Sequence, residues 1–278
     1  MTTSSPERTH DRRIPIAQKE LAAPGRGRLQ KYRELVVGRP GWIPLVRYEL
    51  VLLLSAWVPG ALGLFLRSKL YPLLLGACGR NVTFGQNVVL RHPHKIRVGS
   101  DVVIDDHCLL DAKGTDNRGI ELEDGVFIGR NTILSCKNGN IHLEERANLG
   151  FNCEIFSADE VRVGKDVMLA AYVYLVGGDH FHDRVDVPVS WQGRTGLPIT
   201  VGEGAWLGAH AVVAGGVRIG CHAILGAGGV ALEDVPDYHV AAGVPARALR
   251  DRRVTAKAGE ETSPGGSPGS HSIVDQKG

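Results

Sequence analysis

The chain has 278 residues, enough for one large domain or two small ones, and its 43% hydrophobic content is ordinary for a globular protein. A net charge of +2, with no run of Lys and Arg interleaved with aromatic residues, gives no indication of nucleic-acid binding. The 36 glycines and the 6% of aromatic residues favour many tight turns over a bulky aromatic core.

The N-terminal end of the chain is basic, because residues 1–48 hold ten Arg or Lys against four acidic residues. We expect a disordered basic tail over residues 1–30 and a helical, apolar segment over residues 31–78. The five cysteines are odd in number, include no Cys-x-x-Cys pair and follow no recognisable signal peptide. These features favour a reducing, cytoplasmic compartment.

Residues 50–66, LVLLLSAWVPGALGLFL, contain no charge. They are at the lower length limit for a membrane-spanning helix, and Pro59 in their middle disfavours a straight helix. We expect two short helices bent at Pro59, with basic residues at their ends, among them Arg67 and Lys69, meeting anionic lipid headgroups. Residues 47–69 would then contact the inner face of a membrane peripherally. Packing of both helices on the protein's own core or on a sister subunit is the alternative.

An aliphatic residue recurs every six positions in the middle of the chain. One run is Val201, Leu207, Val213, Ile219 and Leu225. A period of six fits neither a helix nor a free strand, so the chain must turn after each short strand. Three strands and three turns make a coil of eighteen residues with the aliphatic side chains inside. The sequence therefore predicts a mainly β fold, a triangular parallel β-helix over residues 79–250, with Cys108 and Cys153 as small core residues.

Glycines recur at the predicted turns, where we expect them to supply backbone angles that other residues avoid. They are Gly99, Gly129, Gly164, Gly202 and Gly220. Coil starts are 18 residues apart from Val201 to Ile219 but 38 apart from Val163 to Val201. This difference predicts an extruded loop over residues 177–197. A tail rich in Gly, Ser and Pro over residues 251–278 is expected to be disordered.

Residues 201–250 carry motifs typical of one protein family. They are Trp206-Leu207-Gly208, Gly226-Ala227-Gly228, Asp234-Val235-Pro236 and Ala242-Gly243-Val244-Pro245-Ala246-Arg247. On these motifs the chain resembles the hexapeptide-repeat acyltransferases, in particular sugar O-acetyltransferases of the maltose, galactoside and colanic-acid type, over about residues 80–250. The resemblance implies a left-handed parallel β-helix, a homotrimer with active sites between subunits, acetyl-CoA (acyl-CoA) as donor, and no metal.

The resemblance places the catalytic residue at the start of the extruded loop. Members of the family carry a histidine seventeen residues beyond the aliphatic that opens the coil, and Val163 plus seventeen is His180. Its imidazole would take the proton of a sugar hydroxyl. Asp179 and Asp183 are candidates to orient the ring, as is a backbone carbonyl. His182 fits the pattern only with a two-residue slip, so it is either a substrate contact or a solvated loop residue.

Further positions follow from the same resemblance. Asn152 corresponds to an asparagine that touches the acceptor, and the alternative is a simple turn residue. Coenzyme A would lie in a groove between subunits, bordered by Trp206, Gly208, Ala209, Ala227, Arg247 and Arg250. Backbone N–H groups around Gly208 and Ala209 are also candidates to stabilise the tetrahedral oxyanion.

The chain departs from the family pattern at Leu232 and Glu233, where relatives commonly carry Thr and Lys. This change replaces a hydroxyl and a cation near the nucleotide. Either coenzyme A binds more weakly, or Arg218 or Arg247 compensates.

We therefore predict an O-acetyltransferase that moves an acetyl or other acyl group from coenzyme A to a hydroxyl of a sugar or polysaccharide precursor. Two alternatives stay open. One is a non-catalytic solenoid that acts as a scaffold or membrane-tethered binding module. The other is a γ-class carbonic anhydrase, which needs three histidines around a zinc-like ion, whereas the sequence offers only His180 and His182 on one loop. The acceptor is not readable from the sequence.

Overall fold

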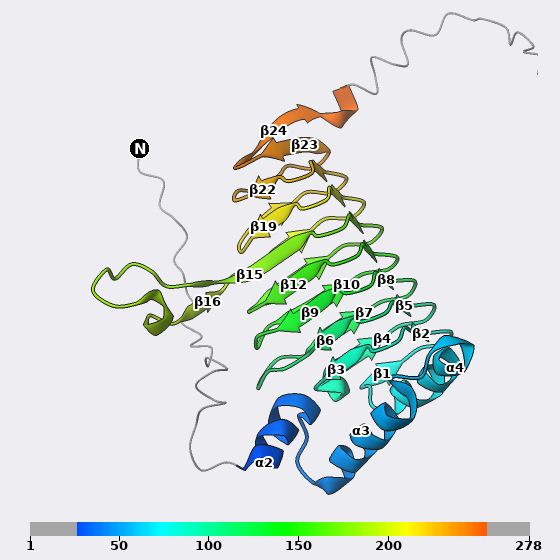
Figure 1. Ribbon diagram of the computed structural model, residues 1–278. Helices are drawn as coiled ribbons and strands as arrows, with labels where there is room; N and C mark the ends of the chain where they lie inside the picture. The colour runs from blue at the N-terminus through cyan, green and yellow to red at the C-terminus, as the bar shows by residue number, and fades with distance from the viewer. Residues whose placement is uncertain (1–26, 255–278) are drawn as a thin grey trace, which may run out of the picture.

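The computed structural model describes residues 27–254, in which short strands stack into a column with helices at its N-terminal end (Figure 1). Most of the two predicted disordered tails, residues 1–26 and 255–278, lies outside the described residues. The helices and helical turns are α2 (Arg28–Tyr32), the π-helical turn η1 (Arg33–Val37), α3 (Trp42–Ser55), α4 (Gly60–Leu70), and the 3₁₀ turns η2 (Tyr71–Leu73), η3 (Pro93–Lys95) and η4 (Val189–Trp191).

The strands form three sheets, which are the three sides of the prism. The first sheet holds β1 (Ala77–Cys78), β4 (Ile96–Val98), β7 (Ile120–Leu122), β10 (Asn140–Leu143), β13 (Glu160–Val163), β17 (Ile199–Val201) and β20 (Arg218–Ile219). The second holds β2 (Thr83–Phe84), β5 (Val103–Ile104), β8 (Phe127–Ile128), β11 (Asn148–Leu149), β14 (Met168–Leu169), β18 (Trp206–Leu207), β21 (Ile224–Leu225), β23 (His239–Gly243) and β24 (Ala246–Asp251). The third holds β3 (Val89–Arg91), β6 (Leu109–Asp111), β9 (Ile133–Cys136), β12 (Glu154–Ser157), β15 (Tyr174–His180), β19 (Val212–Ala214) and β22 (Val230–Ala231), with β16 (Arg194–Gly196) attached to β15.

Along the column, strands pair in parallel with the strands one coil before and one coil after, as the six-residue period predicts. Ile128 of β8, for example, pairs with Ile104 of β5 and Leu149 of β11, and all three side chains are fully buried. Cys108 and Cys153 are buried in the same core, as predicted. Each coil alone has an unpaired edge and an exposed apolar face, so stacking satisfies the backbone and buries the core together.

The turn glycines act differently from the sequence prediction. Gly99, Gly129, Gly164, Gly202 and Gly220 are all absent from the residues with positive φ. A Cβ at Gly202 would instead lie 2.6 Å from the backbone nitrogen of Cys221 on the next coil. Glycine is needed there because the stacked coils touch, not because of backbone angles. The positive φ values fall on other corner residues, such as Asn131 at 60° and Asn152 at 54°.

Helices α3 and α4 cover the first coil. The chain breaks at Pro59, the N-cap residue of α4, so the prediction of two short helices bent at this proline is confirmed. Two buried tyrosines fix the helical segment to the solenoid, because the hydroxyl of Tyr48 donates to the carbonyl of Leu90 (2.7 Å) and that of Tyr71 to the carbonyl of Val88 (3.1 Å). Within residues 27–254, every helix is too short or too polar to cross a membrane.

Arg67 does not face solvent, so the expectation that it meets lipid headgroups is wrong. Its side chain is buried, and its guanidinium donates to the carbonyl oxygens of Phe84 (2.8 Å), Ser55 (3.1 Å) and Val58 (2.7 Å). Ser55 is the last residue of α3, where helical carbonyls lack intrahelical partners. Arg67 therefore joins the end of α3, the turn before α4 and the first coil.

Candidate active site

The candidate site begins where β15 outgrows the third sheet. Its neighbour β12 ends opposite Gly177, but β15 continues to His180 and pairs there in antiparallel fashion with β16. In this pairing Arg194 lies directly opposite His180. The two strands carry the loop that projects from the side of the column (Figure 1). The register that predicted an insertion therefore marks a hairpin with His180 and Arg194 at its base.

The hydrogen bonds of His180 run through its main chain. Its backbone N–H donates to the Asp179 carboxylate (2.7 Å), and its carbonyl lies 2.9 Å from Nδ1 of His182. Nδ1 of the His180 ring is buried and has no hydrogen-bond partner among residues 27–254. The same is true of Nδ1 in His92 and His94 at the helical end, so what distinguishes His180 is its place at the base of the hairpin.

The loop beyond His180 is held together by its own contacts. Arg184 forms an ion pair with Asp186, and Gln192 exchanges hydrogen bonds with the backbone N–H (3.0 Å) and carbonyl (2.7 Å) of Arg184. Asp183 is exposed to solvent, and Trp191 is 72% exposed. These contacts give the loop a defined shape while leaving its polar and aromatic side chains accessible.

Glycines let the hairpin lie close to the preceding coil. A Cβ at Gly178 would stand 2.8 Å from the Cβ of Ala158 and 3.4 Å from the Phe156 ring, and one at Gly196 would stand 2.5 Å from the Ala158 carbonyl oxygen. Contacts this short exclude a larger residue unless the hairpin shifts. The position of His180 therefore depends on these two glycines.

The base of the hairpin is cationic. Lys137 lies with its ammonium 5.5 Å from the centre of the Phe156 ring, the same ring that faces Gly178. Burial lowers the pKa of Lys137, and the positive charges of Lys113 and Arg194 lower it further. Sequence reasoning missed both Lys137 and Arg194. Their signal is positional, since Lys137 directly follows β9 in the third sheet and Arg194 lies in the insertion.

A second group of predicted residues lies at the corner between the second and third sheets. Asn152 has a positive φ there and donates its N–H to the Arg130 carbonyl (2.9 Å). On the following coils the same corner carries Tyr172 and His210, whose rings stack with centroids 4.7 Å apart. His210 is thus part of a corner ladder, as expected, and Asn152 is a turn residue whether or not it also touches an acceptor.

Gly208 and Ala209 lie at this same corner, two coils beyond Asn152. The N–H of Gly208 already donates to the carbonyl of Leu225 on the next coil (2.8 Å). The carbonyl of Ala209 accepts from Gly228 (2.8 Å), whereas its N–H has no backbone acceptor within the described part of the chain. Of the two predicted oxyanion donors, the Ala209 amide is the one left available. Ala227 is exposed next to Gly228.

Within one chain, the hairpin residues around His180 and the corner residues around Asn152 lie far apart. Asn152 is in register with Tyr172, which lies two residues before β15 begins and eight residues before His180. At about 3.3 Å per residue, that length of strand separates the corner from His180 by roughly 26 Å. Asp179, His182 and Asp183 lie with His180, whereas Asn152, Gly208, Ala209 and Ala227 lie on the other corner.

The predicted nucleotide contacts lie at the C-terminal end of the column. Arg247 forms an ion pair with Glu233 (3.2 Å), the residue that departs from the family pattern. Arg218, the other proposed compensating cation, pairs with Asp237 (2.9 Å). Both pairs are exposed and therefore weak, so either arginine can exchange its partner for a phosphate at little cost.

Comparison with known proteins agrees with the repeat register. Residues 198–232 match the family described as the hexapeptide repeat of succinyl-transferase. The galactoside O-acetyltransferase of Escherichia coli is 35% identical over 113 residues, which are 40% of this chain and 54% of that protein. The probable acetyltransferase Rv3034c of Mycobacterium tuberculosis is 27% identical over 139 residues, 50% of this chain and 46% of that protein.

The chain is therefore similar to hexapeptide-repeat acetyltransferases, among them a galactoside O-acetyltransferase. It spans about half the length of the curated relatives that it matches. Among solved structures, it is similar to AntD, an N-acyltransferase from Bacillus cereus in complex with dTDP and 3-hydroxybutyryl-CoA, at 14% identity and a TM-score of 0.49, over 74% of this chain and 96% of that one. A TM-score at this level adds nothing to what the sequence comparisons establish.

The candidate side chains for chemistry are those of the hairpin and of the corner. Among residues 27–254, no group of three or more His, Cys, Asp or Glu side chains is placed to hold a metal ion.

Proposed function

We propose that the protein is an acyl-CoA-dependent O-acetyltransferase acting on a hydroxyl of a sugar or glycan precursor. The observation that carries this proposal is the position of His180, at the base of a shaped hairpin with a buried, unpartnered ring nitrogen, in a chain similar to sugar O-acetyltransferases.

The reaction needs one base and one oxyanion donor. The Nε2 atom of His180 accepts the proton of the acceptor hydroxyl as its oxygen attacks the thioester carbonyl. The resulting tetrahedral oxyanion receives a hydrogen bond from the Ala209 amide. When the intermediate collapses, the C–S bond breaks and the thiolate of coenzyme A takes the proton from His180. The products are the acetyl ester and coenzyme A, and the histidine returns to its neutral form.

This chemistry requires more than one copy of the chain, because His180 and the Ala209 corner lie roughly 26 Å apart along one subunit. We propose that the hairpin of one copy faces the corner of its neighbour in a homotrimer. The projecting hairpin supports this assignment, since it extends beyond the side of its own column (Figure 1). The Nδ1–H group of His180, which has no partner within one chain, would then donate a hydrogen bond to the neighbouring subunit at this contact.

The donor would lie along that contact, with its pantetheine arm near Ala227 and Trp206. Trp206 is 45% exposed, which leaves its ring free to cover the arm. Phosphates of coenzyme A would be met by Arg247 and Arg250 near the end of the column. Binding the nucleotide requires Arg247 to exchange its Glu233 ion pair for a phosphate, so Glu233 competes with the ligand for the same cation.

The deciding experiment measures thiol release from acetyl-CoA by the purified full chain, with mass spectrometry of the products from a panel of sugar acceptors. We expect His180→Ala to lower kcat by ~100-fold or more, the loss typical of a removed general base. His107→Ala is the control, since His107 is an exposed histidine on an early coil, and it should change kcat less than about threefold.

Equal turnover by His180→Ala and wild type would refute the catalytic assignment. Absence of thiol release with every acceptor tested would instead favour the binding-module alternative.

A further inference from the structure

Helices α3 and α4 leave large apolar side chains uncovered at the N-terminal end of the column. Each is between 43% and 83% exposed: Trp42, Ile43, Val46, Leu50, Leu53, Leu54, Trp57, Leu62, Leu64, Phe65 and Leu73. We call this set the apolar face. Monomeric soluble proteins rarely expose so many large apolar side chains on one short stretch of chain, so another apolar phase is expected to cover it.

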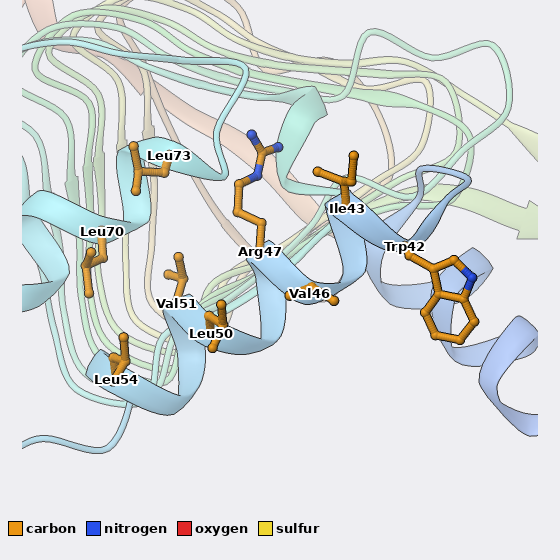
Figure 2. Close-up of a pocket in the computed structure, with 9 residues that line it drawn as sticks. All are labelled: Trp42, Ile43, Val46, Arg47, Leu50, Val51, Leu54, Leu70 and Leu73. Atoms are coloured by element: carbon orange, nitrogen blue, oxygen red, sulfur yellow. The ribbon is translucent and has the colours of Figure 1, made fainter.

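A groove runs along the apolar face. It has a volume of about 520 Å³ and is lined by Trp42, Ile43, Val46, Arg47, Leu50, Val51, Leu54, Leu70 and Leu73. Figure 2 shows the side chains of α3 in a row, with Leu70 and Leu73 beside them on the neighbouring helical turns. Arg47 is its one charged lining residue. A groove of this composition lacks the several polar groups that orient a polar small molecule and suits hydrocarbon instead.

The charges near the apolar face are mostly positive. Arg47 and Lys69 are exposed on α3 and α4, and Arg39 and Arg80 are exposed close by in the chain. Glu49 is the acidic residue of this stretch, and it accepts a hydrogen bond from Tyr32 (2.5 Å). A basic margin around an apolar surface complements anionic lipid headgroups.

Geometry favours a position in the headgroup region over insertion across the bilayer. The 14 residues of α3 and the 11 of α4 are roughly 21 and 17 Å long, against a hydrocarbon core of about 30 Å. Their inner sides are fixed to the first coil by Tyr48 and Arg67, so the helices cannot leave the solenoid. Trp42 and Trp57, at the two ends of α3, are the residue type enriched at membrane–water interfaces.

We propose that the apolar face docks the protein on the surface of an anionic bilayer, with α3 and α4 lying in the headgroup plane and their apolar side chains in contact with the acyl chains. The proposal is independent of the proposed catalytic activity, since it concerns the helices alone. The cytoplasmic leaflet, with its anionic lipids, is the membrane surface that fits the compartment expected from the sequence.

Docking would place the candidate active site near the membrane. The third-sheet strand β15 lies four coils beyond β3, the strand of that sheet nearest the helices. At about 4.8 Å per coil, His180 would stand roughly 19 Å above the first coil. If the proposed acetyltransferase activity holds, a glycan attached to a membrane lipid is within reach of such a site.

The test is flotation of the full chain with two kinds of vesicle. One kind contains phosphatidylcholine alone, and in the other about one lipid in three is the anionic phosphatidylglycerol. We expect the wild type to float with the anionic vesicles, more weakly with the neutral ones, and less as salt is raised. Leu50→Ser combined with Leu54→Ser should reduce binding at least ~10-fold, because it removes two leucines that are 51% and 56% exposed and support nothing in the core.

The matched control is Leu232→Ser combined with Leu249→Ser, which removes two leucines of similar exposure, 57% and 65%, from the opposite end of the column. It should bind vesicles like the wild type, and circular dichroism should show both double variants folded. Failure of the wild type to float with either vesicle would overturn the proposal. So would loss of self-association in the Leu50→Ser, Leu54→Ser variant with vesicle binding unchanged, because that result assigns the apolar face to a second copy of the chain.

Discussion

Asp179 supports His180 through the main chain: its carboxylate accepts the backbone N–H of His180 at 2.7 Å, and no hydrogen bond joins the carboxylate to the ring within the described part of the chain. The contact fixes the backbone at the point where the candidate base leaves the third sheet. In this role the carboxylate acts as a hydrogen-bond acceptor.

The role of Asp179 can be separated from ring orientation by two variants. Asp179→Asn retains an acceptor oxygen and should keep kcat within about threefold, whereas Asp179→Ala loses it and should lower kcat by ~10-fold through misplacement of His180. Asp183→Ala is the control, because Asp183 is exposed on the same loop. Steady-state kinetics with acetyl-CoA provide the readout. If the carboxylate charge orients the imidazole in the assembled site, Asp179→Asn should instead lower kcat as much as Asp179→Ala does.

Gly178 and Ala158 should behave as a coupled pair. The Cβ of alanine at position 178 would lie 2.8 Å from the Ala158 Cβ, so Gly178→Ala should destabilise the fold by about 1–3 kcal/mol and displace the hairpin. Adding Ala158→Gly removes the atom that clashes and should recover a large part of the loss. Urea unfolding of the two single variants and the double variant measures this coupling. Strict additivity of the two substitutions would show that the close contact is not what requires glycine.

Arg67 should be far more important for stability than its surface neighbour Arg47. Arg67→Lys keeps the charge but cannot reach the three carbonyls that the guanidinium bonds, so we expect a loss of about 3 kcal/mol or more. Arg47→Lys, at an exposed position, should change stability by less than about 0.5 kcal/mol. Thermal unfolding compares the two. Similar melting temperatures for both variants would mean that solvent replaces the lost hydrogen bonds.

The fold was predictable because the solenoid repeats one local rule. The interior position of Ile128 follows from counting in sixes, and its pairing with Ile104 follows from the coil length. The turn glycines show the limit of that rule. Their position directly after an aliphatic residue of the repeat indicates a turn. The reason for glycine at position 202 is the approach of Cys221 from the next coil, which only the three-dimensional stacking reveals. Arg67 shows the same limit, since its position beside an apolar run says nothing about the three carbonyls it meets.

The candidate site was predictable where it follows the register. His180 follows from the family resemblance, which places a histidine seventeen residues beyond Val163, and the insertion follows from the spacing of coil starts. Arg194 could not be assigned, because its place opposite His180 depends on how the insertion folds back as β16. The partners of the His180 ring could not be assigned either, since the residues that complete the proposed site belong to a corner that one chain holds far from it.

Acid should destabilise the junction between the helices and the solenoid through His94. Burial, and next the positive charges of Arg39, His92 and Lys95, lower the pKa of His94 from 6.5 to about 4. Between about pH 6.5 and 4, His94 is therefore protonated in the unfolded chain but neutral in the folded chain. Stability should fall progressively as pH drops from about 6.5 to 4, by up to about 3 kcal/mol from this residue. Above pH 6.5 both states are neutral at His94, and the effect vanishes.

Urea unfolding at pH 7.5 and 4.5 should show a smaller difference in the free energy of unfolding for His94→Gln than for wild type. His182→Gln, an exposed control, should match wild type. An equal acid loss in wild type and His94→Gln would place the sensitivity elsewhere.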